Sequence, residues 1–106
     1  MTAAQVVIVV RLLAGLYAVD AQMMDCIAMR ESDYNVNAQN GIHIGVMQWS
    51  PSTLAWLGGK AQADPLWLHG HMDSTEPVYQ IALSAWAIRN NYGSHWATFS
   101  MCEEGR

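Results

Sequence analysis

Apolar residues recur at helical spacing in the first third of the chain. Residues 3–18 place apolar side chains three or four positions apart, and this pattern predicts a helix that is amphipathic or buried. The positions that form the pattern are Val6, Val10, Leu13, Leu16 and Tyr17. Asp20 then stands as an N-cap before a second apolar stripe, which predicts a second helix from about Ala21 to Ser32.

Turn-forming residues dominate the next segment. Asparagine and glycine are concentrated in residues 33–42, which predicts a loop with a short hairpin around residues 40–41. Ser50 is a suitable cap for a short helix over 51–57, with proline at its first position. The two glycines at 58–59 are expected to end this helix, and the segment after them has no period and is expected to be irregular.

Two further helices are predicted near the end of the chain. A helix with a broad apolar face is expected over 75–92, capped by Ser74 or Thr75 and ended by Gly93. A last short helix is predicted over 94–102. Together these elements predict a mainly α fold of five or six helices with at most a small β-hairpin.

Composition narrows the possible functions. A chain of 106 residues is expected to fold as one domain, 1–106, because smaller pieces would lack a core. Charged residues make up 13%, about half of the roughly 25% of an average domain, and five Lys and Arg cannot form a footprint on nucleic acid. The longest apolar run, 6–19, is too short for a membrane span and contains Arg11, which also argues against a membrane anchor.

The N-terminus carries no convincing signal peptide. Its first five residues have no positive charge, and Arg11 interrupts the apolar stretch. Cleavage after Ala21 is the alternative interpretation.

Cysteines, histidines and aromatic residues leave several alternatives open. Cys26 and Cys102 either pair in an oxidising compartment or remain buried free thiols, and their spacing does not decide. His69 and His71 lie two apart without a third ligand at a recognisable spacing, so neither a metal nor another cofactor is expected. Five Trp and four Tyr against one Phe suit surfaces that stack on sugars, or simply fill a core with large rings.

Glu31 is the strongest candidate for chemistry. It falls in the last turn of the predicted second helix, where the helix dipole and apolar neighbours both raise the pKa of a carboxyl group. A carboxyl that stays protonated near neutral pH is able to protonate a leaving glycosidic oxygen. The alternative is an exposed glutamate paired with Arg30 or another neighbour.

Several short motifs occur together around Glu31, in a fixed order. They are Val19-Asp20, Glu31-Ser32, Tyr34-Asn35, Gly45-Val46-Met47-Gln48 and Pro51-Ser52-Thr53. In order and spacing they resemble the catalytic domain of lytic transglycosylases of the soluble type, within the lysozyme-like superfamily. Residues 81–102 resemble the closing segment of resuscitation-promoting factors and of phage lysozyme-like domains.

The resemblance implies an activity and a set of site residues. The expected activity is cleavage of the β-1,4 bond between N-acetylmuramic acid and N-acetylglucosamine in peptidoglycan, with Glu31 as the proton donor. Gln48 and the loop near Asn40 would hold the N-acetyl groups, and Ser32 is counted with them as a substrate-binding residue. The residues expected to offer flat surfaces to sugar rings are Trp49, Trp86 and Tyr92. The resuscitation-promoting factors also imply a disulfide between Cys26 and Cys102.

Other functions remain alternatives to this hypothesis. The first is a hydrolytic lysozyme, which normally needs a second carboxylate, for which Asp33, Asp64 and Asp73 are the candidates. The second is an inactive cell-wall-binding or structural module on the same fold. We expect a monomer that acts on peptidoglycan outside the cytoplasmic membrane, as a phage lysis or virion enzyme or as a domain of a secreted protein.

Overall fold

The fold consists of helices and one small hairpin. It was obtained as a computed structural model, which describes residues 1–70, 76–96 and 98–104. The helices are α1 (Ala3–Leu16), α2 (Ala21–Ser32), α3 (Pro51–Gln62), α4 (Pro77–Arg89), the 3-10 turn η1 (Gly93–His95) and α5 (Thr98–Glu104). The strands β1 (Gln39–Asn40) and β2 (His43–Ile44) form the hairpin. The predicted mainly α fold is therefore confirmed.

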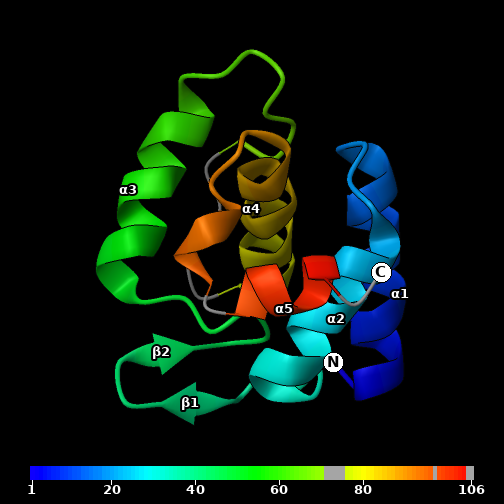
Figure 1. The fold of residues 1–106 in the computed structure, drawn as a ribbon. Coiled ribbons are helices and arrows are strands. Elements are labelled where there is room, and N and C mark those ends of the chain that lie inside the picture. The colour runs from blue at the N-terminus through cyan, green and yellow to red at the C-terminus, as the bar shows by residue number, and fades with distance from the viewer. Residues whose placement is uncertain (71–75, 97, 105–106) are drawn as a thin grey trace.

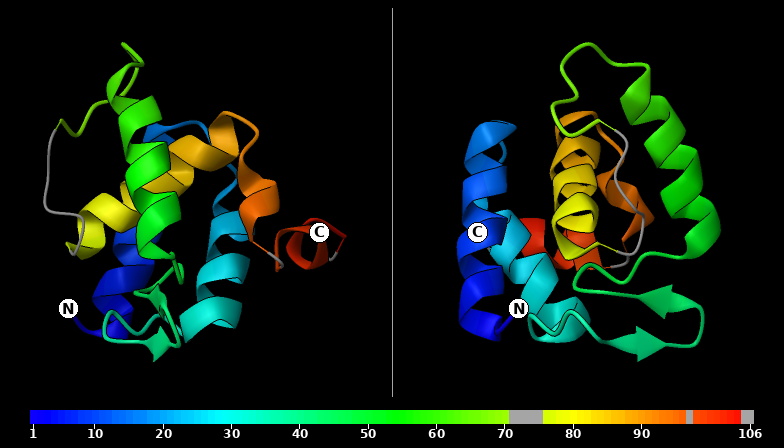
Figure 2. Two further views of the ribbon diagram at one scale, coloured as in Figure 1. Left: turned by 90° about the vertical axis from the view of Figure 1, so that its left-hand side faces the viewer. Right: turned by 180° about the vertical axis from the view of Figure 1, so that it is seen from behind.

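Helix α4 is the centre of the molecule. Every residue from Tyr79 to Ala87 is buried, as expected for a helix that is packed on all sides. Figure 1 shows α4 between α3 on one side and α1 on the other, with α2 and α5 in contact near one end. The views in Figure 2 show that the hairpin and the last turn of α2 lie at the same end of the molecule.

The hairpin and the start of α2 form where they were predicted. Asn40 pairs with His43 in an antiparallel register, with the turn at residues 41–42 between them. At α2, Asp20 Oδ1 accepts hydrogen bonds from the backbone N–H groups of Gln22 at 2.8 Å and Met23 at 3.3 Å. These bonds satisfy donors that the helix itself leaves free.

The predicted end of the third helix is wrong. The glycines at 58–59 do not end α3, which continues to Gln62. Gly58 faces α4, and a Cβ there would lie 2.5 Å from the Tyr79 hydroxyl oxygen. The glycine therefore permits a close approach of two helices, and this packing outweighs the roughly 1 kcal/mol by which glycine weakens a helix interior.

The predicted boundaries near the C-terminus also shift. Helix α4 begins at Pro77 and its N-cap position is Glu76, whose side chain makes no capping bond. Ser74 and Thr75, the predicted caps, lie outside the described residues. The helix ends at Arg89 because the following N–H groups turn back, including that of Tyr92 to the Ala87 carbonyl at 2.8 Å.

The last helix begins later than predicted, because the 3-10 turn η1 precedes it. Gly93 opens η1 instead of directly ending the preceding helix, and α5 covers Thr98–Glu104 instead of 94–102. Packing again selects glycine here, because a Cβ on Gly93 would overlap the ring of Phe99.

Two side-chain links hold α2 in place. A disulfide joins Cys26 on α2 to Cys102 on α5, with 5.7 Å between the two Cα atoms. Arg11 on α1 forms an ion pair with Asp25 on α2, with Nε 2.9 Å from Oδ2. Arg11 thus has a partner on the neighbouring helix. Among the helices that the structure describes, none has the length and apolar character to cross a bilayer.

Candidate active site

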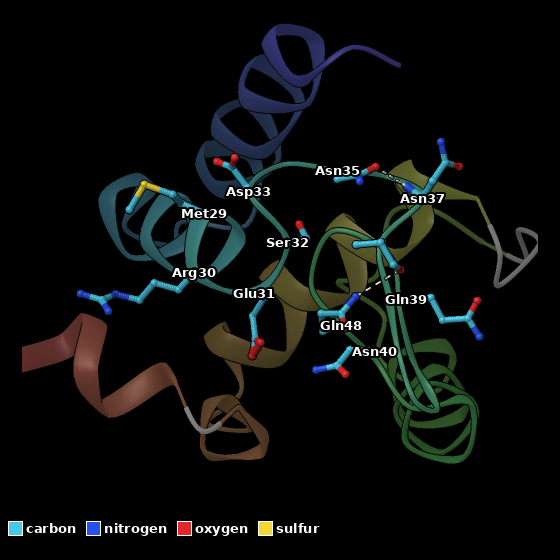
Figure 3. Close-up of a pocket in the computed structure, with 11 residues that line it drawn as sticks. Met29, Arg30, Glu31, Ser32, Asp33, Asn35, Asn37, Gln39, Asn40 and Gln48 are labelled. Atoms are coloured by element: carbon cyan, nitrogen blue, oxygen red, sulfur yellow. Dashed lines mark hydrogen bonds between the residues drawn. The ribbon is translucent and has the colours of Figure 1, made fainter.

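Glu31 lies in the last turn of α2, beside an open groove of about 570 Å³. The groove is mostly polar. The side chains that line it include Glu31, Ser32, Asp33, Asn35, Asn40 and Gln48. Figure 3 shows the Glu31 side chain extending from α2 on the side of the groove near Gln48 and Asn40.

The end of α2 is fixed by a sharp reversal of the chain. Asp33 and Tyr34 both have left-handed backbone conformations, with φ of 52° and 61°. Two successive residues of this kind end the helix directly after Glu31 and Ser32. The Tyr34 hydroxyl donates to the Asp25 carbonyl at 3.3 Å, which ties the reversed chain back to α2.

Ser32 joins α2 to the segment that carries Gln48. Its hydroxyl lies 2.7 Å from the Val46 carbonyl oxygen and 3.2 Å from that of Ala28. A hydroxyl has one proton, so these two acceptors share it. Ser32 lines the groove, and its donor is used to hold the two walls together.

Gln48 is oriented by the loop around it. Its Nε2 atom donates to the carbonyl oxygens of Ala38 at 3.2 Å and Gly45 at 2.9 Å. Both partners are acceptors only, which requires the amide nitrogen to face them and the amide oxygen to face away. Gln48 therefore has Oε1 as the atom with which to accept a hydrogen bond from a ligand.

Gly45 is required for this arrangement. Its φ is 81°, and a Cβ there would overlap the side-chain amide of Gln80 on α4. Its N–H donates to the Ala38 carbonyl at 2.9 Å. The glycine lets the loop lie directly against the central helix.

The surroundings of Glu31 raise the pKa of its carboxyl group. Burial is the main cause, because it removes water from the charged form. Electrostatic interaction with His43 and, to a smaller extent, the Thr98 side chain act in the opposite direction and lower the pKa. The net rise agrees in direction with the expectation from the sequence, which rested on the helix dipole and apolar neighbours.

The predicted aromatic sugar surfaces lie outside this groove. Trp49 is 2% exposed, and its indole nitrogen donates to the Ser84 hydroxyl at 2.9 Å. Trp86 is 4% exposed and donates to Asp64 Oδ2 at 2.8 Å. Tyr92 stacks on Trp86, with 5.7 Å between ring centroids. The structure does not bring these three residues together with Glu31.

Two neighbours of Glu31 were not assigned a function from the sequence. His43 has no partner residue at a recognisable motif spacing in the sequence, but the hairpin places it opposite Asn40 and so near the groove. Thr98 has no local signal, because it lies far from Glu31 in the sequence and reaches it only through packing of α5 on α2.

Of the histidine pair, the structure describes His69 alone. The His69 ring nitrogen Nδ1 lies 2.6 Å from the Tyr17 hydroxyl. His71 and Asp73 lie outside the described residues, and so does the side chain of His95. Among the side chains that the structure describes, no group of three His, Cys, Asp or Glu is placed to hold a metal ion.

The two acidic side chains that line the groove point in different directions. Asp33 is the other acidic residue that lines it, and Figure 3 shows the Asp33 and Glu31 side chains directed to opposite sides. Asp64 is held by Trp86 and by the backbone N–H of Leu66 at 3.0 Å. The groove therefore supports proton transfer by one carboxyl group, surrounded by amide side chains.

The chain matches the model of a known protein family. A family model described as the transglycosylase SLT domain matches residues 10–99 of the chain. No curated protein and no solved structure matches it.

Proposed function

Because the chain belongs to the transglycosylase SLT domain family, we propose that Glu31 cleaves the glycan strands of peptidoglycan by general acid–base catalysis. The bond cleaved is the β-1,4 linkage between N-acetylmuramic acid and N-acetylglucosamine. The observation that carries this proposal is the raised pKa of the Glu31 carboxyl, which lies in a polar groove within the matched region.

Glu31 acts twice in the proposed reaction. As an acid it gives its proton to the glycosidic oxygen, and the bond from that oxygen to the anomeric carbon breaks. The N-acetyl group of the same sugar stabilises the positive charge that develops on this carbon. Glu31, now ionised, takes the proton of the sugar's own 6-hydroxyl, whose oxygen bonds to the anomeric carbon. The products are a 1,6-anhydromuramic end and a free 4-hydroxyl.

Gln48 and Asn40 are the proposed contacts to the substrate. Gln48 Oε1 faces away from the two carbonyls that hold its nitrogen, so it is suited to accept the N–H of an N-acetyl group. Asn40 is exposed on β1 at the edge of the same groove, where its amide both donates and accepts.

The alternative outcome is hydrolysis by a lysozyme. A hydrolytic glycosidase normally positions a second carboxylate across the scissile bond. Asp33 is the candidate from the groove, but its side chain is directed away from that of Glu31. This geometry favours the anhydro product.

Substitution of Glu31 tests the proposal. Glu31→Gln keeps the shape of the side chain and removes the proton donor, so we expect loss of lysis by at least about a hundredfold. The measurement is the fall in turbidity of purified peptidoglycan, followed by mass spectrometry of the released muropeptides. The matched control is Asp33→Asn, which should retain activity and give the same anhydro ends.

Each contrary result identifies a different alternative. Hydrated, reducible ends together with an inactive Asp33→Asn variant would indicate a lysozyme. Wild-type protein that binds peptidoglycan without releasing muropeptides would indicate a binding module. Glu31→Gln with wild-type activity would remove Glu31 as the acid.

The proposed substrate also sets where the protein acts. Peptidoglycan lies outside the cytoplasmic membrane, so we propose that the protein works there, as one domain and as a monomer.

A further inference from the structure

The Thr98 hydroxyl is an unusual group in this structure. Its oxygen is buried, and it has no hydrogen-bond partner at standard geometry among the described residues. A buried hydroxyl without a partner is costly, and native proteins rarely keep one without a reason. The group that it influences is the Glu31 carboxyl: the Thr98 side chain acts to lower the pKa of this carboxyl, against the larger effect of burial.

These two observations fit a contact that is longer or less well aligned than an ideal hydrogen bond. Such contacts are common at catalytic groups in the absence of substrate, and they tighten when charge develops. Figure 3 shows the Glu31 carboxyl directed toward the η1 segment, with α5, which begins at Thr98, to one side of it.

The chain on both sides of Thr98 is held firmly. Before it, the indole nitrogen of Trp96 donates to the Met47 carbonyl at 2.7 Å, in the segment next to Gln48. After it, the Phe99 ring packs against Gly93. Further along α5, Cys102 is bonded to Cys26 on α2, the helix that carries Glu31. Thr98 is therefore placed by contacts that involve the same elements as the groove.

We propose that Thr98 is a positioning residue for Glu31. The Thr98 hydroxyl donates a hydrogen bond to the Glu31 carboxylate once Glu31 has given its own proton to the leaving oxygen. This inference rests on the proposed function of Glu31. The hydrogen bond stabilises the ionised carboxylate between the two steps and fixes its orientation toward the 6-hydroxyl that it must deprotonate. The Thr98 oxygen is buried, so it acts through Glu31 and not on the sugar.

The other groups around Glu31 do not substitute for this hydroxyl. His43 on β2 is exposed and acts through its charge. Arg30, which precedes Glu31 on α2, and Asp33, which follows the end of the helix, are exposed at the groove. Thr98 on α5 is the buried donor of the set.

The test compares Thr98→Val, which keeps the shape without the hydroxyl, with Thr98→Ser, which keeps the hydroxyl. The first measurement needs no activity: the pKa of Glu31 is read from the pH dependence of its side-chain carboxyl ¹³C signal, assigned by its loss in Glu31→Gln. We expect the valine variant to raise this pKa by about half a unit or more, because it removes a hydrogen bond to the charged form. Serine should restore it.

The second measurement is the pH profile of peptidoglycan lysis. We expect about a tenfold lower rate for Thr98→Val at the wild-type optimum and a basic limb displaced to higher pH. Thr98→Ser should return both to near the wild-type values.

The results separate this inference from the proposed function. If wild-type protein is active and Glu31→Gln is not, but Thr98→Val leaves both the carboxyl titration and the pH profile unchanged, Thr98 is not a positioning residue. The same conclusion follows if the valine variant has a lower melting temperature but the pKa of Glu31 is unchanged. If wild-type protein shows no lysis at all, the proposed function fails, whereas the effect of Thr98 on the titration is still decided by the NMR measurement.

Discussion

Glu31 is placed where catalysis and stability have opposing requirements. Its partly buried position raises the pKa of the carboxyl, which keeps the proton available for the glycosidic oxygen. The folded state therefore binds this proton more tightly than the unfolded state does. The resulting contribution to stability is fully present below the unfolded pKa and is lost as the pH rises through the folded pKa.

Glu31→Gln is accordingly expected to stabilise the protein at neutral pH. The amide has no charge to desolvate, so its melting temperature should exceed that of the wild type by about 2 °C near pH 7. The difference should shrink as the pH falls and vanish near pH 3, where the wild-type carboxyl is also neutral. Thermal melts at several pH values, with exposed Asp33→Asn as the control, measure this. A wild type that is the more stable of the two at neutral pH would contradict it.

Single residues were predictable where their partners are close in the sequence. Asp20 caps the N–H groups two and three positions ahead, and Glu31 lies in the last turn of the helix that follows. The burial of Trp49 and the proximity of Thr98 to Glu31 depend on helices that come much later in the chain. A local sequence pattern does not predict contacts between residues that are far apart in the chain.

At the level of elements, α3 shows that tertiary packing decides whether a glycine ends a helix. Two adjacent glycines usually end a helix, yet α3 passes through both. Gly58 faces Tyr79, whereas a Cβ on Gly59 would meet no atom within 4 Å. The same residue type thus serves close packing at one position and has no packing function at the next.

This difference gives a prediction with an internal control. Gly59→Ala should stabilise the protein by about 0.5–1 kcal/mol, because alanine is the better helix former and the space is open. Gly58→Ala should destabilise it by about 1–3 kcal/mol, because the new methyl group displaces the Tyr79 ring from its packed position. Denaturant unfolding of both variants measures the free energies. Equal effects of the two substitutions would contradict the assignment of Gly58 to the interface with α4.

For the whole molecule, the fold class was predictable and the mutual placement of the helices was not. Helical periodicity identified the main helices and the asparagine-rich turn identified the hairpin, because both are local. The groove is lined by the end of α2, the loop after it, β1 and Gln48, whereas the packing of α5 on α2 beside Glu31 had no signal in the sequence. Trp96 supports the Gln48 segment from the far end of the chain, because its indole nitrogen donates to the Met47 carbonyl, directly before Gln48.

The disulfide between Cys26 and Cys102 joins α2 to α5. Its removal tests how far the stability of the protein and the pKa of Glu31 depend on this bond. The two cysteines are 76 positions apart, so the bond removes about 4.5 kcal/mol of chain entropy from the unfolded state. We expect reduction to lower the melting temperature by more than about 10 °C, since a domain of this size has a small entropy of unfolding per molecule. The double variant Cys26→Ala/Cys102→Ala is the control, and its melting temperature should not respond to reductant. Two thiols that react with an alkylating agent in the native, unreduced protein would contradict the bond.

Because α5 also carries Thr98, the pKa of Glu31 should be higher in reduced protein kept below its melting temperature. This effect would link the stability of the whole molecule to the acid in its groove.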